Sequence, residues 1–509
     1  MCVALLVTLS LPRAAAAQEG RGAQDDDYVT NDGDQVAFDR AWSAYKKLGP
    51  WRRAHAARAA YEELFALAAG GVWYWASHDL NSTDWDIPPT AQAIFDRFRN
   101  LDYVRFDTNR FFVNQGHILA GTGYYLLARS NDMGPALSLL YAFATSTTWE
   151  WVVEFREKPS INDLITSPLG GEALGEALYQ LGEVYHRGGN LPLAARVLTA
   201  PFSVPRAVHR WLDDAPPDPV LPKFGPPLAH TFRLRVGGGA RNGPDDATRP
   251  IGSIALSTRV AAMPGYQHPG RFSTGFANGN FTALDLDLRL GSEGIEATTA
   301  QARAIMFGYY RQRIDPGPRG YDLTIGAARG VRVVYSDVDG LHDRIGIVDL
   351  IGPALTFDTF DGDLHLSAEV ETFLDFGSVA SAAFPQYAAA HGKEGVRSEL
   401  EAEGYYFAWG GTIVSNVSLS YRPVSIGADM RFAQFSQIGG FDRFHGNDVP
   451  TKVDLDDRRL AFEGWARLDV TPSLALQARY GAYRLDSSLD EFSSSRRFRE
   501  YTGSLQYTF

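Results

Sequence analysis

Six polar residues lie among apolar ones in the first half of the chain, and their side chains could carry chemistry. They are His117, Glu150, Glu154, Asp163, Glu172 and Glu176. The four glutamates form two pairs spaced four residues apart, which places each pair of carboxylates on one face of a helix. Together with His117, two such pairs could ligate a metal ion or share a proton in acid–base catalysis.

A structural role for the same residues competes with that chemistry, and we favour it. Ser160 or Asp163 can cap a helix, and carboxylates buried at a helix junction often accept hydrogen bonds from Trp, Arg or backbone groups. Gly170 and Gly171 indicate close helix packing, because a phosphate-binding loop would need a preceding strand and a lysine. The sequence therefore predicts a structural polar cluster, with no metal and no cofactor.

A second set of charged residues alternates with apolar ones from Ala229 to the C-terminus. Leu284 and Leu286, for example, alternate with Asp285 and Asp287. In a strand, a period of two places the two sets on opposite faces of the sheet. The residues expected on the charged face are Arg233, Arg235, Asp285, Asp287, Arg289, His365, Glu369, Glu371, Asp375, Asp429, Arg431, Glu463, Arg467, Asp469 and Arg479.

Alternation alone does not separate a barrel from a soluble sandwich, because both bury one face of each strand. The alternating segments are about 10 to 20 residues long, against roughly 5 to 6 for soluble strands and about 9 to 11 for a tilted bilayer crossing. We place strands near 228 to 240, 249 to 263, 279 to 292, 297 to 313, 320 to 337, 343 to 359, 363 to 376, 400 to 422, 424 to 438, 456 to 470, 473 to 487 and 496 to 509.

The turns between these strands fall into two classes. Tight turns such as Arg422-Pro423 alternate with longer polar loops at 377 to 397 and 439 to 455. Such a division is typical of outer-membrane barrels. We predict a transmembrane antiparallel β-barrel of about 12 strands; the long stretch 264 to 278, on the tight-turn side, leaves ten or fourteen strands open.

The two ends of the chain indicate export to the envelope. An apolar run at residues 3 to 11 precedes Ala15 and Ala17, which are placed for cleavage of a signal peptide after residue 17. The segment from Tyr501 to Phe509 resembles the closing strand of bacterial outer-membrane proteins. That resemblance implies two partners, outer-membrane lipid and the barrel assembly machinery, which recognises a terminal strand ending in Phe.

The region before the barrel shows helical spacing of apolar residues. Helices are expected at Trp51 to His78, Phe111 to Arg129, Pro135 to Glu157, Gly171 to Arg187 and Leu191 to Leu198. The fold class is therefore α+β and multi-domain. Its parts are a signal peptide (1–17), a disordered acidic segment (18–34), a helical periplasmic domain (35–200), a Pro-rich linker (201–227) and the outer-membrane barrel (228–509).

Several motifs within residues 80 to 190 resemble an uncharacterised bacterial envelope family in which a helical segment precedes an outer-membrane region. They are Asp107-Thr-Asn109, Ala128-Arg-Ser-Asn131, Trp149-Glu150, Glu154-Phe-Arg-Glu157, Ser160-Ile-Asn-Asp163, Pro168 and Gly175-Glu176. The resemblance implies no established activity. The family has Pro after the motif histidine where this chain has Ile118, a departure that weakens any role for His117.

Composition excludes some functions. The net charge of −12 disfavours nucleic-acid binding, and the mean hydropathy of −0.20 shows no helical membrane bundle. The single cysteine, Cys2, lies in the expected signal peptide, so the mature chain would have no disulfide.

Two functions follow from these features. The first is a non-enzymatic outer-membrane barrel, for solute passage or envelope organisation, with the helices docked beneath or into its periplasmic mouth. Charged residues of both signs on the inner face favour a filled or plugged lumen over an open pore. The alternative is a membrane-embedded lipid hydrolase or acyltransferase, motivated by His117 and the buried carboxylates.

Overall fold

The computed structural model describes most of the chain, including all the predicted strands. The described residues are 31–46, 54–78, 85–100, 103–215, 228–243, 247–317, 319–338, 341–392, 400, 404–439 and 453–509. The expected signal peptide, residues 18–30 of the expected acidic segment, and 216–227 of the expected linker lie outside these residues.

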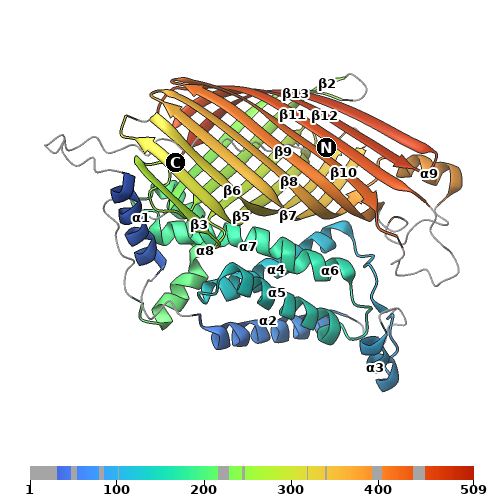
Figure 1. Cartoon of the computed structure of the whole chain (residues 1–509). Coiled ribbons are helices and arrows are strands. Elements are labelled where there is room, and N and C mark those ends of the chain that lie inside the picture. Colours follow the sequence, from blue (N-terminus) through green and yellow to red (C-terminus); the bar gives the residue numbers. More distant parts are fainter. Residues whose placement is uncertain are drawn as a thin grey trace.

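Twelve of the thirteen strands in the described part of the chain close into one antiparallel barrel (Figure 1). Each barrel strand pairs with the next along the chain, β3 being passed over, and β1 pairs with β13 to close the ring. The strands are β1 (Ala229–Asn242), β2 (Thr248–Ala261), β3 (Gly270–Phe276), β4 (Phe281–Gly291), β5 (Gly294–Asp315), β6 (Arg319–Val338), β7 (Leu341–Asp361), β8 (Leu364–Ala380), β9 (Tyr405–Tyr421), β10 (Val424–Gln437), β11 (Leu455–Asp469), β12 (Leu474–Leu489) and β13 (Phe492–Thr508).

All twelve predicted strands are present, and their number settles the count that the sequence left open. The difficult stretch 264–278 contains β3, which pairs only with the last part of β5, beyond the start of β4. It is therefore an added strand at one end of the barrel. We call this end, where β1 begins and β13 finishes, the Phe509 end, and the opposite end, which carries helix α9 (Phe384–His391), the α9 end.

Side chains alternate between the inside and the outside of the barrel as the period of two predicts. On β10, Asp429 and Arg431 are buried inside, whereas Ile426 and Met430 are exposed on the outer wall. Apolar side chains of this kind are exposed on every barrel strand. The predicted transmembrane barrel, with a polar interior and an apolar outer wall, is confirmed.

The helices before the barrel form a layer of their own. They are α1 (Asn31–Lys46), α2 (Ala56–Ser77), α3 (Ala91–Arg99), α4 (Phe111–Ser130), α5 (Pro135–Thr148), α6 (Ile161–Ile165), α7 (Gly171–Arg187) and α8 (Leu193–Leu212), with π-helical turns η3 (Trp149–Val153) and η4 (Thr166–Gly170). Helix α8 continues through Pro201 and Pro205, so residues 201–212 are helical where the sequence indicated a linker. None of the described helices is long and apolar enough to cross a membrane.

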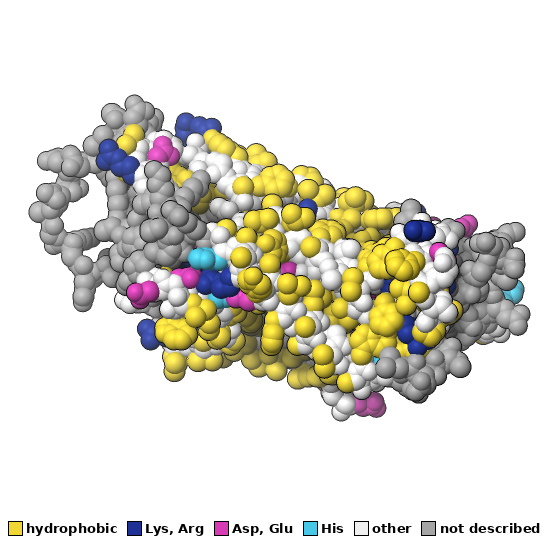
Figure 2. Space-filling model, turned by 90° about the horizontal axis from the view of Figure 1, so that it is seen from below, with side chains coloured by type: hydrophobic (Ala, Val, Ile, Leu, Met, Phe, Trp, Pro, Cys, Tyr) yellow, Lys and Arg dark blue, Asp and Glu magenta, His cyan; other side chains and the backbone are white. Residues whose placement is uncertain are grey.

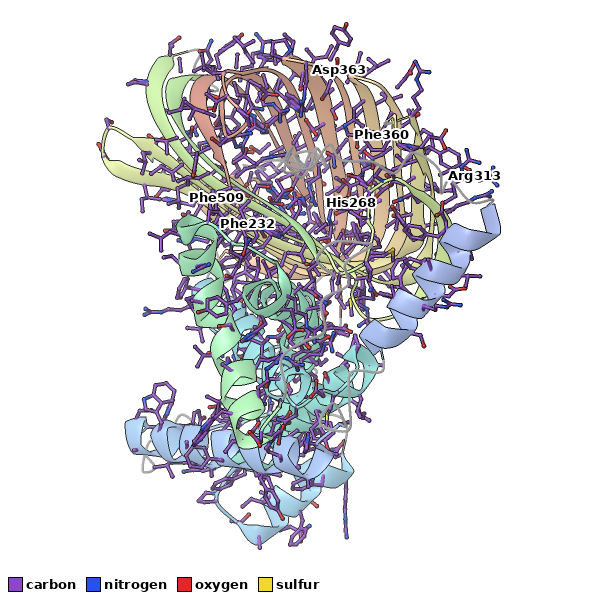
Figure 3. All side chains as sticks on the ribbon, turned by 90° about the vertical axis from the view of Figure 1, so that its left-hand side faces the viewer. Phe232, His268, Arg313, Phe360, Asp363 and Phe509 are labelled. Atoms are coloured by element: carbon purple, nitrogen blue, oxygen red, sulfur yellow. The ribbon has the colours of Figure 1, made fainter. Side chains whose placement is uncertain are left out.

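The helices lie beside the barrel wall, which differs from the expected docking beneath or into the mouth. Figure 3 looks into the Phe509 end, with Phe232 and Phe509 on its rim, and shows most helices outside the ring of strands. Helix α7 contacts β4, β5 and β6, and η4 contacts β7. The outward-facing Val331 and Leu284 are buried in a core shared with Ala173 and Ala177 of α7.

Helix α1 is the exception, because it lies at the Phe509 end. Phe38 stacks on Phe272 of β3, with ring centroids 4.0 Å apart. The side-chain amide of Gln35 donates to the backbone carbonyl of Ser273 and accepts from its N–H. These two hydrogen bonds occupy part of the free edge of β3, an edge that would otherwise be open to pairing with another chain.

Glycines bring α4, η4 and α7 into close contact. A Cβ atom at Gly121 would lie 1.7 Å from the carbonyl oxygen of Ser167, and one at Gly171 would lie 2.4 Å from the carbonyl carbon of Gly121. Both positions therefore exclude a side chain. The close packing predicted for Gly170-Gly171 is confirmed, since Gly170 itself packs against Ile118 and Val348.

We predict that Gly121→Ala destabilises the protein by about 1 to 3 kcal/mol, because the added methyl group has no space. Gly123→Ala is the matched control: it lies in the same helix, is exposed, and a Cβ atom there would meet nothing within 4 Å. That change should be neutral or stabilise by up to about 1 kcal/mol through helix propensity. Thermal unfolding of both variants in detergent checks this, and equal midpoints would contradict the packing argument.

Candidate functional site: the barrel lumen and the buried polar cluster

The lumen is crossed by ion pairs between strands that are not neighbours. Arg303 of β5 contacts Glu369 and Glu371 of β8, with 2.6 Å between Nη2 and the Glu369 carboxylate. Arg459 of β11 donates to both carboxylate oxygens of Asp343 on β7, at 2.8 Å each. Because β5 and β8, and β7 and β11, are separated by other strands, these side chains span the interior.

The fifteen polar residues that the sequence placed on the charged face lie on the inner side of the barrel. Arg431 donates to Gln301 of β5 at 3.0 Å, again across the barrel. The remaining contacts join residues on the same or nearby strands: Arg259 with Asp285, Arg289 with Asp287, Arg479 with Glu463, Trp465 with Asp429, His365 with Asp358, and Arg467 with Asp469. Asp469, near the Phe509 end, is the most exposed of the fifteen, at 36% of its side chain.

Sequence reasoning missed the residues that matter most for closing the lumen. Arg303, Arg459 and Asp343 occupy the same alternating face as the predicted residues, so the period of two could have found them. It could not have paired them. Which strands face each other across a barrel depends on strand number and stagger, and neither is encoded locally.

Apolar layers close the ionic interior at both ends. At the α9 end, Tyr387 of α9 packs with Tyr406, Phe435 and Leu489. At the Phe509 end, Phe38 of α1 packs in one core with inward-facing residues such as Tyr310.

Between the two layers, a cavity of about 40 Å³ is lined by Arg259, Arg303, Glu369 and Tyr266, among others. Such a space holds a few waters at most. Within the described residues, the ion pairs across the lumen and the apolar layers at its ends occupy much of the interior.

The six-residue polar cluster divides into separate parts. His117 Nε2 lies 3.6 Å from Asp163 Oδ2. Glu150 accepts the backbone N–H of Ser160 at 2.8 Å, and the Ser160 hydroxyl caps α6 by accepting from Asp163 N. Asn162 donates to both Asp163 and Asn114, so an asparagine network joins these elements. The capping role predicted for Ser160 is confirmed.

The other three glutamates have their own partners. Glu154 accepts from the indole of Trp149 at 2.8 Å. Glu172 pairs with Arg329, which projects from the outer wall of β6. Glu176, fully buried, accepts from Arg129, Tyr125 and Gln180.

These contacts link helices to one another and to the barrel. In the described part of the chain, no group of three or more His, Cys, Asp or Glu side chains is placed to hold a metal ion. The contacts of the cluster thus lie at the junction of the helices and the barrel wall, with His117 beside Asp163.

Burial raises the pKa of four carboxyl groups of the cluster, those of Glu150, Glu154, Asp163 and Glu172. Burial raises the pKa of Glu150 well above its usual range, with the nearby Asp163 carboxylate adding to the effect. Burial likewise raises the pKa of Glu154 to about 8, and the Glu157 charge contributes. A carboxyl group whose pKa is raised by folding stabilises the folded state below its unfolded pKa and loses that contribution as pH rises.

We predict that Glu154→Gln flattens the pH dependence of stability between about pH 4.5 and 8. The wild-type protein should lose stability across this range as Glu154 ionises in a half-buried site, and the amide cannot ionise. Unfolding in detergent at several pH values measures the difference, which should grow with pH in favour of the variant. Parallel curves for the two proteins would contradict the raised pKa of Glu154.

A matched pair of arginines tests the lumen network. Arg303→Met should destabilise the barrel by about 3 to 5 kcal/mol, because it leaves Glu369 and Glu371 buried without their cation. Arg271→Met removes an ion pair with Asp315 in which both side chains are about half exposed, and should cost at most about 1 kcal/mol. Samples of each variant are heated to a series of temperatures before electrophoresis, and the temperature at which the folded band disappears reports stability. An equal loss of stability in the two variants would refute a buried network.

In the closed barrel, the backbone N–H and C=O groups of the twelve ring strands bond to neighbouring strands. Charged side chains point inside and apolar side chains point outside. The fold is that of an outer-membrane β-barrel. Within residues 103–200 the chain matches the model of a domain of unknown function (DUF3943). This match overlaps the segment whose motifs indicated an uncharacterised envelope family. No curated protein matches the chain.

Solved structures similar to this chain are bacterial outer-membrane barrels. The translocator domain of autotransporter NalP from Neisseria meningitidis shares 10% identity at a TM-score of 0.20, covering 64% of this chain and 99% of its own. Omp33 from Acinetobacter baumannii shares 9%, at 0.20, covering 55% and 99%. An anion-selective porin from Comamonas acidovorans shares 9%, at 0.21, covering 55% and 100%. Such low TM-scores carry no argument about function.

Proposed function

We propose that this protein is a non-conducting, non-enzymatic barrel of the outer membrane that serves envelope organisation by anchoring its helical layer. The observation that carries the proposal is the set of ion pairs across the lumen, Arg303 with Glu369 and Glu371 and Arg459 with Asp343. Together with the apolar layers at both ends, they occupy the path that a solute would take. Of the two non-enzymatic roles, the filled lumen supports organisation over passage.

The outer wall supports the location in the outer membrane. Exposed apolar residues such as Val417, Ile426 and Leu476 form a surface that water would solvate poorly and acyl chains would solvate well. Strand β13 closes the barrel by pairing with β1, from Arg233 with Thr508 to Asn242 with Arg499. We propose that the assembly machinery recognises this strand through its terminal Phe509.

The Phe509 end, with α1, is the part that we propose faces the periplasm. Tight turns such as Arg422-Pro423 and Asp361-Gly362 lie at this end, as periplasmic turns do in other barrels. Because the remaining helices lie beside the wall, we propose that the periplasmic location holds for α1 and not for the whole helical layer.

The alternative, a lipid hydrolase or acyltransferase, finds less support. It would need a nucleophile activated by His117. The hydroxyl nearest to Asp163 in the hydrogen-bond network, Ser160 Oγ, donates to Asn162 and caps α6. Its bonds are already committed to the fold.

The proposed function predicts that the full chain, reconstituted in planar bilayers, shows no steady conductance above the lipid background. A porin inserted under the same conditions is the control for incorporation. Intact folding is checked by faster migration of unheated than boiled samples on gels. Stable ion-conducting steps from the folded wild-type protein would refute the closed lumen and restore solute passage as the function.

A further inference from the structure

The side of the helical layer that faces away from the barrel is mostly apolar, with charged side chains gathered toward the left in Figure 2. Large apolar side chains are exposed along α2, α4 and α5, and Figure 2 shows hydrophobic atoms across this side of the molecule. They include Tyr61, Leu64, Phe65, Val72, Trp73, Phe112, Val113, Leu119, Leu137 and Leu140. Phe65 is 76% exposed and Phe112 is 82% exposed. We call this surface the outer helical face.

Helices α2, α4 and α5, which the structure describes completely, carry few charged groups, and these are bonded within the protein. Arg58 and Glu62, which lie beside Tyr61 and Phe65, pair with Asp213 and His209. Glu63 of α2 is buried against Thr145 of α5, and Arg129 of α4 is buried against Glu176 of α7. A water-soluble helical domain instead carries many charged side chains on its outside.

The layer also lies in the middle of the barrel's apolar band. On β6, the covered Val331 is flanked on the same face by Ile325 and Tyr335, which are 48% and 41% exposed. On β5, the covered Ala302 lies between Ile295 and Phe307 on that face, which are 62% and 51% exposed. The helices therefore cover a patch that has lipid-facing wall on either side along the strand.

The wall beneath the helices is adapted to them. Outward-facing residues of β5 here are small, Ala302 and Ala304, and Gly346 of β7 leaves no room for a Cβ beside Gln115 of α4. Arg329, a cation on the outward face of β6, is paired with Glu172 of α7. An unpaired arginine at such a position would be costly in a bilayer.

From these observations we infer that the outer helical face contacts the acyl chains of the outer membrane, so that the helical layer is embedded beside the barrel. This inference rests on the proposed insertion of the barrel. When the barrel spans the bilayer, anything covering the middle of its wall displaces lipid and must itself be surrounded by lipid. The outer helical face then continues the apolar surface of strands such as β9 and β10.

The chemistry of the face agrees with that partner. Acyl chains make no hydrogen bonds, and a surface of Leu, Phe, Val and Ala side chains asks for none. The exposed patch is also larger than the scattered apolar residues found on monomeric soluble proteins. Inside the layer, glycine contacts between α4 and α7 resemble the close packing of small residues used by helices in membranes.

Fluorescent labelling of single cysteines in the full chain tests the inference. In a Cys2→Ser background, Phe65→Cys of α2 and Leu140→Cys of α5 would carry an environment-sensitive probe. Ile426→Cys on the free wall of β10 is the lipid control, and Ser473→Cys in the exposed turn before β12 is the water control. The labelled proteins are folded into vesicles of phosphatidylethanolamine and phosphatidylglycerol, and quenched either by nitroxide-labelled lipid or by aqueous iodide.

We expect probes at Phe65 and Leu140 to lose fluorescence to the nitroxide lipid as the Ile426 probe does, and to be protected from iodide. If Ile426 is quenched by lipid but the two helical positions are quenched by iodide, the helical layer lies in water and the inference fails. Quenching by neither reagent would mean that another protein surface, such as a second copy, covers the face, which also overturns it. If the Ile426 probe itself is quenched only by iodide, the barrel is not inserted and the proposed location fails.

Discussion

A hydrocarbon environment offers no hydrogen bonds, so every polar group within it must find a partner inside the protein. Both halves of this chain follow that constraint at many of their buried charged groups. The strands satisfy their backbone groups by closing β13 onto β1, and the inner wall pairs its arginines with carboxylates across the lumen. The helices turn Glu63, Arg129 and Glu176 inward in the same way.

The same constraint explains how the two halves join. Arg329 would be a misplaced cation on a bare lipid-facing wall, but Glu172 of α7 neutralises it. Small outward-facing residues on β5, and Gly346 on β7, leave space for the helices to pack closely against the barrel. The barrel and the helical layer therefore depend on one another. The segment around residues 103–200, which carries the sequence motifs, forms much of the contact between them.

The ion pairs across the lumen and the hydrogen bonds around Asp163 both join elements of the fold to one another. The apolar layers at the two ends and the ion pairs between them hold the strands in one arrangement, which a wide water-filled pore would not do. The outer surface is the part of such a barrel that contacts its surroundings. In this molecule the outside consists of two kinds of apolar surface, one of strands and one of helices.

The sequence alone determined the twelve barrel strands and most of the helices. It also showed which face of each strand is charged and which is apolar, because the periods of 2 and 3.6 are local properties of a chain. It did not show that Arg303 reaches Glu369 and Glu371, since partners across a barrel depend on the stagger of the closed ring. It placed the helices at the mouth, whereas packing sets them against the wall. Helical spacing shows that one face of a helix is buried, and only tertiary structure decides whether the other face meets water or lipid.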